Sequence, residues 1–206
     1  MKIKSLGYLT FSMSFDNVDV VTDPLSLEDV GLKFLKTKAD VILHTDSRGI
    51  VDEKKAKPTK KDEVLNIQNP GEFELGGLMV RRDISSPFYI LDEDLLRVVY
   101  VGNISKNIKV DIFKNLGDVE VLIMPVGDGK NFPEFGVIEK IITQVEPLVL
   151  IPSGFRTENM SKGEDLAKVD DFVKQAGYTN VRREKYLNVA GSVEKDVRNM
   201  DVVILE

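Results

Sequence analysis

Residues 117–127 read GDVEVLIMPVG and residues 145–155 read VEPLVLIPSGF, and each stretch holds an uninterrupted apolar run that ends at a proline. The runs Val119–Met124 and Leu148–Ile151 have the length and composition of strands. Between them, Phe135–Val145 carries its apolar residues at helical spacing, which predicts an amphipathic helix. This part of the chain therefore alternates strand and helix.

The first half of the chain is different, because it consists mostly of short strand-like runs joined by turns. Strands are expected where apolar or alternating residues are bounded by turn residues: Met1–Leu6, Thr10–Phe15, Val18–Thr22, Ala39–His44, Val64–Ile67, Glu72–Leu75, Leu78–Arg82, Phe88–Leu91 and Leu95–Val101. The last two are predicted to form a hairpin through Asp92-Glu93-Asp94. The run Ala39–His44 is continuously apolar up to its last residues, as in a strand buried on both faces.

The remaining elements complete a mixed pattern. Helices are expected at Ile108–Asn115 and Asp165–Ala176, the second closed by Gly177, and strands at Val181–Arg183, Tyr186–Val189 and Val202–Leu205. Two sheets with helices outside them satisfy both halves, which predicts an α/β (α+β) fold. No linker, low-complexity tract or short repeat interrupts the chain, so we expect one domain over residues 1–206.

Composition limits the partners. The 206 residues include 28 Lys plus Arg and 34 Asp plus Glu, a formal net charge of −6, so no general attraction to nucleic acid is expected. The lysine-rich stretch Lys54–Lys61 is flanked by acidic residues and is interpreted as a solvated loop, with a weak anion-binding loop as the alternative. The start MKIKSLGYLTF lacks a signal sequence, and no apolar run is long enough to span a membrane. A cytoplasmic protein without a membrane partner is the expectation.

The sequence contains one histidine, His44, and no cysteine. A catalytic zinc site usually takes three protein ligands, mostly imidazole or thiolate, and a two-metal site takes more. One histidine cannot supply that set, so zinc is disfavoured and no cofactor is expected. A hard cation such as magnesium, calcium or manganese, held by carboxylates, stays open as an alternative.

Small or polar residues follow five of the predicted strands, as Asp-Pro, Thr-Asp, Gly-Asn, Pro-Val-Gly and Pro-Ser-Gly. The carboxyl ends of buried strands are where α/β proteins tend to build sites. Turn residues also end strands for purely structural reasons, and the pattern alone favours neither reading.

The order of motifs resembles one branch of the metallo-β-lactamase superfamily, the small metal-dependent hydrolases related to L-ascorbate-6-phosphate lactonases. The similar segments are VVTDP, KADVILHTDSRGIVD, NPGEFELGGLMVR, LRVVYVGNI, GDVEVLIMPVG and VEPLVLIPSGF. The resemblance covers Met1 to about Phe155. It implies a four-layer αββα sandwich, and it leaves a homo-oligomer open without indicating an interface.

The same resemblance implies where metal ligands would stand. The family motif His-x-His-x-Asp-His follows the strand that matches Ala39–Leu43, and a gapless match puts other residues at its four ligand positions: Asp46, Arg48, Ile50 and Val51. Arg48 would bring a fixed positive charge to a cation site, and Ile50 and Val51 have no donor atoms.

The other implied ligand positions also differ. The loop RRDISSPF has no histidine, Asn103 replaces the bridging aspartate, and Gly154 or its neighbour Ser153 replaces the last histidine. Asp23 of VVTDP survives, but in such sites it usually supports the ligands rather than binding the metal. His44 is displaced by two residues from the first ligand position and is interpreted as a hydrogen-bonded structural residue.

Three hypotheses follow. The first is a pseudoenzyme that keeps the fold for binding or assembly. The second is a hydrolase with a non-standard carboxylate site built from Asp23, Asp46, Asp52, Asn103 and Asp128. The third is an anion or small-molecule binder that uses Arg48, Asn103 and the glycine turns Gly127–Gly129 and Ser153–Gly154. No Ser-His-Asp set is predicted, because Ser47 or Ser153 would be an arbitrary partner for His44. The sequence favours a protein without catalytic residues.

Overall fold

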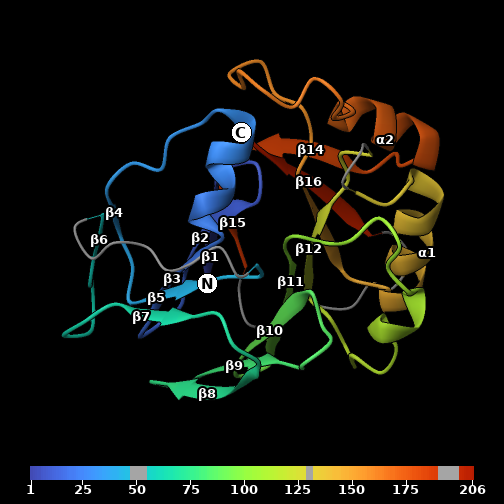
Figure 1. Ribbon diagram of the computed structural model, residues 1–206. Helices are drawn as coiled ribbons and strands as arrows, with labels where there is room; N and C mark the ends of the chain where they lie inside the picture. Colours follow the sequence, from blue (N-terminus) through green and yellow to red (C-terminus); the bar gives the residue numbers. More distant parts are fainter. Residues whose placement is uncertain (47–54, 129–131, 190–199) are drawn as a thin grey trace.

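Two β-sheets face each other in the computed structural model, which describes residues 1–46, 55–128, 132–189 and 200–206 (Figure 1). The smaller sheet contains β1 (Lys2–Gly7), β2 (Thr10–Ser14), β3 (Asp19–Thr22), β5 (Val41–Leu43), β7 (Leu65–Ile67) and β15 (Leu187–Asn188). Its strand order is β15-β1-β2-β3-β5-β7. The strands β3, β5 and β7 are parallel, so their carboxyl ends meet at one edge.

The larger sheet contains β8 (Gly71–Leu75), β9 (Leu78–Arg82), β10 (Phe88–Glu93), β11 (Leu96–Val101), β12 (Val121–Pro125), β13 (Val149–Ser153), β14 (Val181–Glu184) and β16 (Asp201–Leu205). Its order is β14-β16-β13-β12-β11-β10-β9-β8. From β11 to β14 all neighbours are parallel, whereas β8 to β11 form antiparallel hairpins.

Helices cover the outer faces unequally. The helices α1 (Phe135–Val145) and α2 (Val169–Ala176) lie outside the larger sheet (Figure 1). The smaller sheet is covered by a 3-10 helix, η1 (Pro24–Val30), and by the short pair β4 (Thr37–Lys38) and β6 (Ala56–Lys57). The expected four-layer sandwich is present, with one outer layer built from 3-10 helix and extended chain. In the described ranges no helix is long and apolar enough to cross a membrane.

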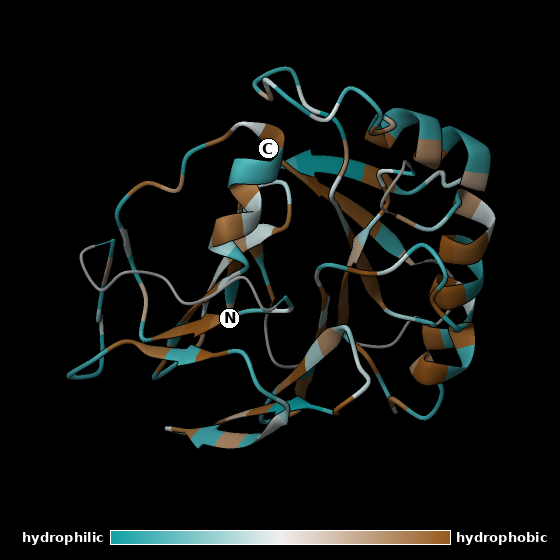
Figure 2. Ribbon diagram, in the orientation of Figure 1, coloured by the Kyte–Doolittle hydropathy of each residue, from teal (hydrophilic) through white to brown (hydrophobic). Residues whose placement is uncertain are grey.

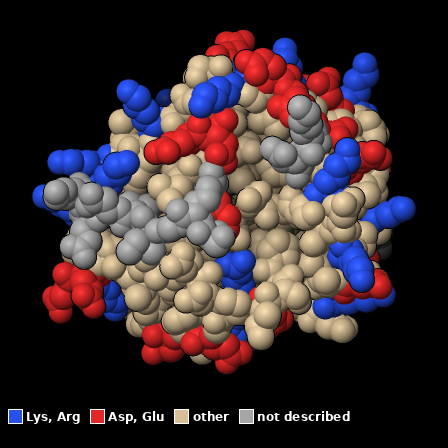
Figure 3. All heavy atoms as spheres, viewed as in Figure 1, with Lys and Arg blue, Asp and Glu red and all other residues tan. Residues whose placement is uncertain are grey.

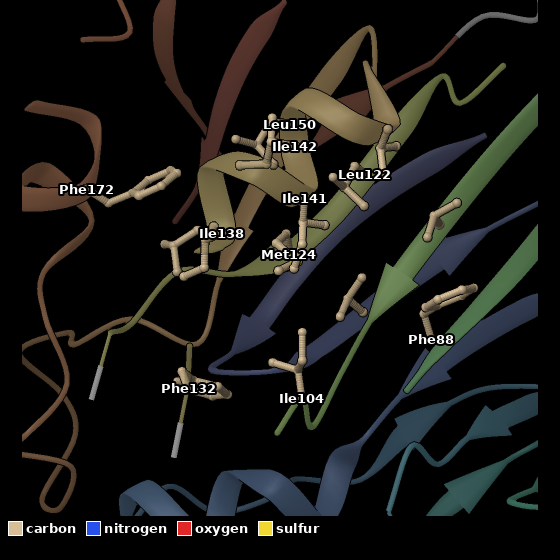
Figure 4. Packing of buried hydrophobic residues seen from close by; sticks show 14 of the residues in the cluster. Phe88, Ile104, Leu122, Met124, Phe132, Ile138, Ile141, Ile142, Leu150 and Phe172 are labelled. Atoms are coloured by element: carbon tan, nitrogen blue, oxygen red, sulfur yellow. The ribbon is translucent and has the colours of Figure 1, made fainter. Parts of the chain in front are cut away.

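Strand alternation divides the buried residues into layers. In β5, Val41 and Leu43 belong to the core between the sheets, while Ile42 packs on the outer face. The outer core of the larger sheet forms under α1, whose Ile138, Ile141 and Ile142 point toward the strands (Figure 4). Figure 2 shows hydrophobic residues concentrated on the strands and α1, and hydrophilic residues along the connecting loops. The helical spacing in 135–145 therefore marks the buried face of α1.

The structure confirms some of the predicted helix boundaries and corrects others. The predicted helix Phe135–Val145 is α1 without change, and Gly177 caps α2 at φ 69°. The helix expected at Ile108–Asn115 is only a short 3-10 turn, η2 (Val110–Phe113), because Lys109 and Lys114 on either side of it are extended. The helix expected from Asp165 begins at Val169, after an extended Lys168.

The β10–β11 turn is tighter than predicted. Asp92 and Glu93 are paired with Arg97 and Leu96, so only Asp94 and Leu95 form the turn. Asp94 adopts φ 53°, a left-handed conformation that aspartate tolerates better than most residues. The 3-10 helix η1 was not predicted.

Asp40 organises the lysine-rich loop. Its Oδ1 accepts hydrogen bonds from the backbone N–H groups of Thr59, Lys60 and Lys61, and its Oδ2 accepts one from Asp19. Burial alone raises the pKa of the Asp40 carboxyl, but these backbone donors outweigh it and hold the pKa below its ordinary value. The described lysines of the loop are exposed, as expected of a solvated loop.

Asp40→Asn should destabilise the fold by about 2 kcal/mol at pH 7, because one oxygen becomes an NH2 group that faces the Asp19 N–H. The depressed pKa of Asp40 contributes stability above the unfolded value, and that contribution is lost as the pH falls through the folded value. The difference between wild type and D40N should therefore shrink below about pH 4. Urea unfolding at several pH values measures it, and the exposed Asp62→Asn is the matched control; equal effects of the two substitutions would contradict the assignment.

Candidate functional site

The carboxyl ends of β3, β5 and β11 meet around Asp23. This residue follows β3, Thr45 follows β5, and Gly102 and Asn103 follow β11. Asp23 Oδ1 accepts a 2.7 Å hydrogen bond from the Thr45 backbone N–H, and Asp23 Oδ2 lies 2.5 Å from Thr45 Oγ1. Thr45 Oγ1 in turn accepts a 2.8 Å bond from the Asn103 N–H. Three of the five strand ends singled out in the sequence therefore form one hydrogen-bonded cluster.

The carboxyl group of Asp23 is 2% exposed and also contacts Tyr100 from the larger sheet. Tyr100 Oη lies 2.5 Å from Asp23 Oδ2 and 2.8 Å from the Leu9 carbonyl oxygen. The phenol has one proton for these two neighbours, and a carbonyl oxygen only accepts. The phenol proton is therefore shared between Asp23 Oδ2 and the Leu9 carbonyl oxygen.

Opposing effects act on the pKa of Asp23. Burial raises the pKa of Asp23, the hydrogen bonds from Thr45 and Tyr100 lower it less, and nearby Asp46 raises it further. Burial also raises the pKa of the Tyr100 phenol well above its ordinary value, and the Asp23 charge adds to this. Burial and the neighbouring charge therefore act against the ionised form of the Asp23 carboxyl, while its hydrogen bonds act in favour of that form.

Gly102 leaves the room that this cluster needs. A Cβ at this position would lie 2.2 Å from both Asp23 Oδ2 and Thr45 Oγ1. Neither atom sits on a long flexible side chain, and both are buried. The Gly-Asn pair after β11 therefore has a structural reason for its glycine.

His44, the single histidine, is buried and bonded. It is 1% exposed, and its Nε2 lies 2.9 Å from Asn66 Oδ1 of β7. The structure confirms the interpretation of His44 as a hydrogen-bonded structural residue.

Arg82 is a site residue that the sequence reading missed. Its guanidinium donates to the carbonyl oxygens of His44 at 2.8 Å and Thr45 at 2.9 Å, and its Nε donates to Ser86 at 3.1 Å. It also lies over the Tyr89 ring, 5.2 Å from the centroid. Side chains alternate between the two faces of β9, so Arg82 lies on the same face as Leu78 and Val80, which both belong to the core between the sheets. This alternation is the sequence signal that could have identified Arg82.

The structure brings only some of the other predicted site positions close to Asp23. Asp46 is half-buried and lies close enough to act on the charge of Asp23, Asn103 is exposed, and Gly154 follows β13 at φ 63°. Asp128 of the carboxylate hypothesis lies after β12, half-buried at φ 27°, whereas Arg48, Ile50, Val51 and Asp52 lie outside the described residues. Within the ranges that the structure describes, no three His, Asp or Glu side chains form a group that could hold a metal ion.

The two glycine turns at the ends of β12 and β13 pack on each other. A Cβ on Gly127 would lie 2.0 Å from the Gly154 carbonyl oxygen, and the Gly154 N–H donates to the Tyr8 carbonyl at 3.0 Å. The buried Ser153 Oγ has no hydrogen-bond partner among the described residues and borders a cavity of about 40 Å³. That volume suits a water molecule rather than a ligand.

Gly102→Ala should destabilise the protein by about 3 kcal/mol or more, because the added methyl group cannot fit beside Asp23 and Thr45. Gly136→Ala is the matched control, since a Cβ there meets nothing within 4 Å and the residue lies in the first turn of α1. That control should be neutral or slightly stabilising. Thermal and urea unfolding measure both, and a G102A protein as stable as wild type would refute the packing described here.

Asp23→Asn should flatten the pH dependence of stability. A carboxyl whose folded pKa is raised contributes its full stability below the unfolded pKa and loses it as the pH rises through the folded pKa. Wild type should therefore lose stability relative to D23N as the pH rises above about 4. Unfolding free energies from pH 4 to 8 measure this, with the exposed Asp83→Asn as control. Parallel curves for wild type and D23N would contradict a raised pKa.

Comparisons with known proteins agree with the fold. A protein from Thermotoga maritima, provisionally described as a zinc-dependent hydrolase of the metallo-beta-lactamase superfamily, is similar over 99% of this chain and 97% of its own. The TM-score is 0.75 at 18% identity. A metallo hydrolase from Ignicoccus hospitalis matches 85% of this chain and 90% of its own, with a TM-score of 0.60 at 16% identity. A provisionally described metal-dependent hydrolase from Parabacteroides distasonis matches 99% and 93%, with a TM-score of 0.57 at 18% identity.

Identities this low show the fold alone, and no curated protein matches the chain. The family itself is shown by a different comparison. The model of the beta-lactamase superfamily domain matches residues 2–153, most of the chain. This chain therefore belongs to the beta-lactamase superfamily and has its metallo-β-lactamase fold.

Proposed function

We propose that this protein keeps the metallo-β-lactamase fold without the metal centre of its relatives, and acts by binding or assembly rather than by metal-dependent hydrolysis. The observation that carries the proposal is the set of residues at the positions that the resemblance assigns to the metal ligands. Arg48, Ile50 and Val51 have no lone pair to offer a metal ion, and Asn103 is a neutral amide in place of a bridging carboxylate. Asp23, which in such sites supports the ligands, has both carboxyl oxygens bonded to Thr45 or Tyr100.

The remaining donors support the same proposal. His44 Nε2 is already bonded to Asn66. At the positions that the resemblance assigns to ligands, the chain has Arg48, Ile50 and Val51, which supply no metal ligand. Of the four motif positions only Asp46 carries a possible ligand, and the one imidazole is engaged, so the residues do not fit the family's metals.

The two alternatives have less support. A hard-cation site would need several ionised carboxylates, but burial favours the neutral form of Asp23. An anion site at the Ser153–Gly154 turn would need free N–H groups, but the Gly154 N–H donates to Tyr8. Figure 3 shows acidic and basic side chains both placed mainly toward the outline of the face it draws, with neutral residues over most of the middle, so the described surface on that side does not favour a polyanion.

Metal analysis tests the proposal. Protein purified from cells grown with added zinc, iron and manganese should contain substoichiometric metal after dialysis. It should also hydrolyse lactone, phosphodiester and β-lactam probes no faster than buffer does, with or without added metal. One or two tightly held equivalents, removed by a chelator together with a measured hydrolytic activity, would overturn it.

A variant with the family's ligands restored tests whether the substituted ligand positions are the reason that the chain holds no metal. Replacing Asp46 and Arg48 by His, Ile50 by Asp and Val51 by His restores the family motif, and Asn103→Asp with Gly154→His restores two of the three further ligands. The restored chain should retain metal in the same analysis when wild type does not, because the ligand types and their spacing then suit zinc. Equal retention by both chains would show that the metal binds elsewhere.

A further inference from the structure

The strand β14 is the edge of the larger sheet at the end nearest α2. Among the described residues it pairs with β16 on one side, and it is the last strand in the sheet order (Figure 1). The Glu206 N–H donates to the Glu184 carbonyl oxygen, so the even-numbered residues of β14 bond to β16. The backbone N–H and C=O groups of Val181 and Arg183 therefore point outward, where a further strand can bond to them.

The exposed side chains of β14 carry both signs of charge. Arg182 and Glu184 lie on the same face of the strand, and each side chain is 45% exposed. Arg182 lies 3.8 Å from Glu184 and 3.6 Å from Asp201, distances longer than those of a hydrogen-bonded ion pair. Exposed pairs with this geometry contribute little to stability, so the two side chains can exchange them for partners on another chain at small cost.

A second copy of β14 is complementary to the first. When two β14 strands pair antiparallel about a two-fold axis at Arg183, the outward backbone groups of the two Arg183 residues bond to each other. In this register Arg182 of each copy lies opposite Glu184 of the other, in the pairs whose side chains approach most closely. Opposite charges placed directly across an antiparallel pair stabilise it. A two-fold axis at Arg182 would instead oppose Arg182 to itself.

The axis brings two Arg183 side chains together, and acidic residues already balance their charge. Arg183 pairs with Asp170 of α2 at 2.5 Å and also with Glu206, which follows β16. Each guanidinium therefore comes to the axis with two carboxylates, which offset the repulsion between the two cations.

The edge strand at the other end of the sheet lacks this complementarity. The exposed residues of β8 are Glu72 and Glu74, and two β8 strands paired antiparallel in register would place glutamate opposite glutamate. Charged residues along an edge strand are a common protection against pairing. Charge therefore favours β14, rather than β8, as the edge that accepts a second copy.

We propose that two copies of this chain form a symmetric dimer through β14, with Arg182 of each copy paired with Glu184 of the other. The dimer joins the two larger sheets edge to edge through backbone hydrogen bonds. This inference rests on the assembly role proposed above and names its partner. Oligomeric state and metal content are measured separately, so the failure of one proposal is distinguishable from the failure of the other.

Charge exchange tests the pairing. Sedimentation velocity of the full chain over a range of concentrations should show a reversible dimer. Arg182→Glu and Glu184→Arg should each weaken the dimer about tenfold or more, because both cross-strand pairs become repulsive. An equimolar mixture of the two variants should associate about as tightly as wild type, since each glutamate then faces an arginine. Glu72→Arg on β8 is the control and should leave the dimer unchanged.

Three outcomes would overturn the proposal. They are a wild-type chain that stays monomeric up to its solubility limit, single variants that dimerise as well as wild type, and a mixture that associates no better than the single variants. The mixture also controls for folding, because a variant that had lost its fold would not be rescued by the other.

A single cysteine locates the axis. The chain has no native cysteine, so Arg183→Cys can form a disulfide only with the same position of a second copy. Opposed residues of a hydrogen-bonded antiparallel pair have Cα atoms about 5.5 Å apart, within the range for a disulfide. Oxidation should therefore give a covalent dimer of R183C, whereas Glu72→Cys on β8 should remain largely monomeric. Equal cross-linking of the two variants would contradict a two-fold axis at Arg183.

Discussion

The buried carboxyl of Asp23 is the constraint around which one edge of the sandwich is built. Taking a carboxylate out of water is costly, and the protein offsets part of that cost by hydrogen bonds to both oxygens. Its partners come from both sheets, since Thr45 follows β5 and Tyr100 lies in β11. Gly102 is required for the same reason, because any side chain there would enter the cluster.

Arg82 provides a second connection at the same edge. It extends from β9 in the larger sheet and bonds to carbonyl groups that follow β5 and β7 in the smaller one, including those of His44 and Gln68. These carbonyl groups lie beyond the strand ends and have no ladder partner there, so the guanidinium satisfies several of them at once. In this chain, hydrogen bonds from the Arg82 side chain thus connect strand ends of the two sheets.

The elements that the sequence predicts well are those with a local cause. The helix α1 follows from the spacing of its isoleucines, and the end of α2 follows from Gly177. The site is harder to predict, because Tyr100 sits in an apolar run and reads as core, while its partner Asp23 is 77 residues away. The 3-10 helix η1 was missed because Pro24 was taken only as the end of a strand, although proline also suits the first turn of a helix.

The two edges of the parallel strands differ in what they leave for a ligand. Around Asp23, the polar groups are bonded to one another, so a ligand would have to break existing hydrogen bonds before making its own. At the amino ends of β12 and β13, three carbonyl groups at the end of α1, those of residues 143–145, lack helical donors. New interactions cost less where polar groups are not already paired within the protein. Among the described residues, the polar groups around Asp23 are therefore the more fully paired of the two sets.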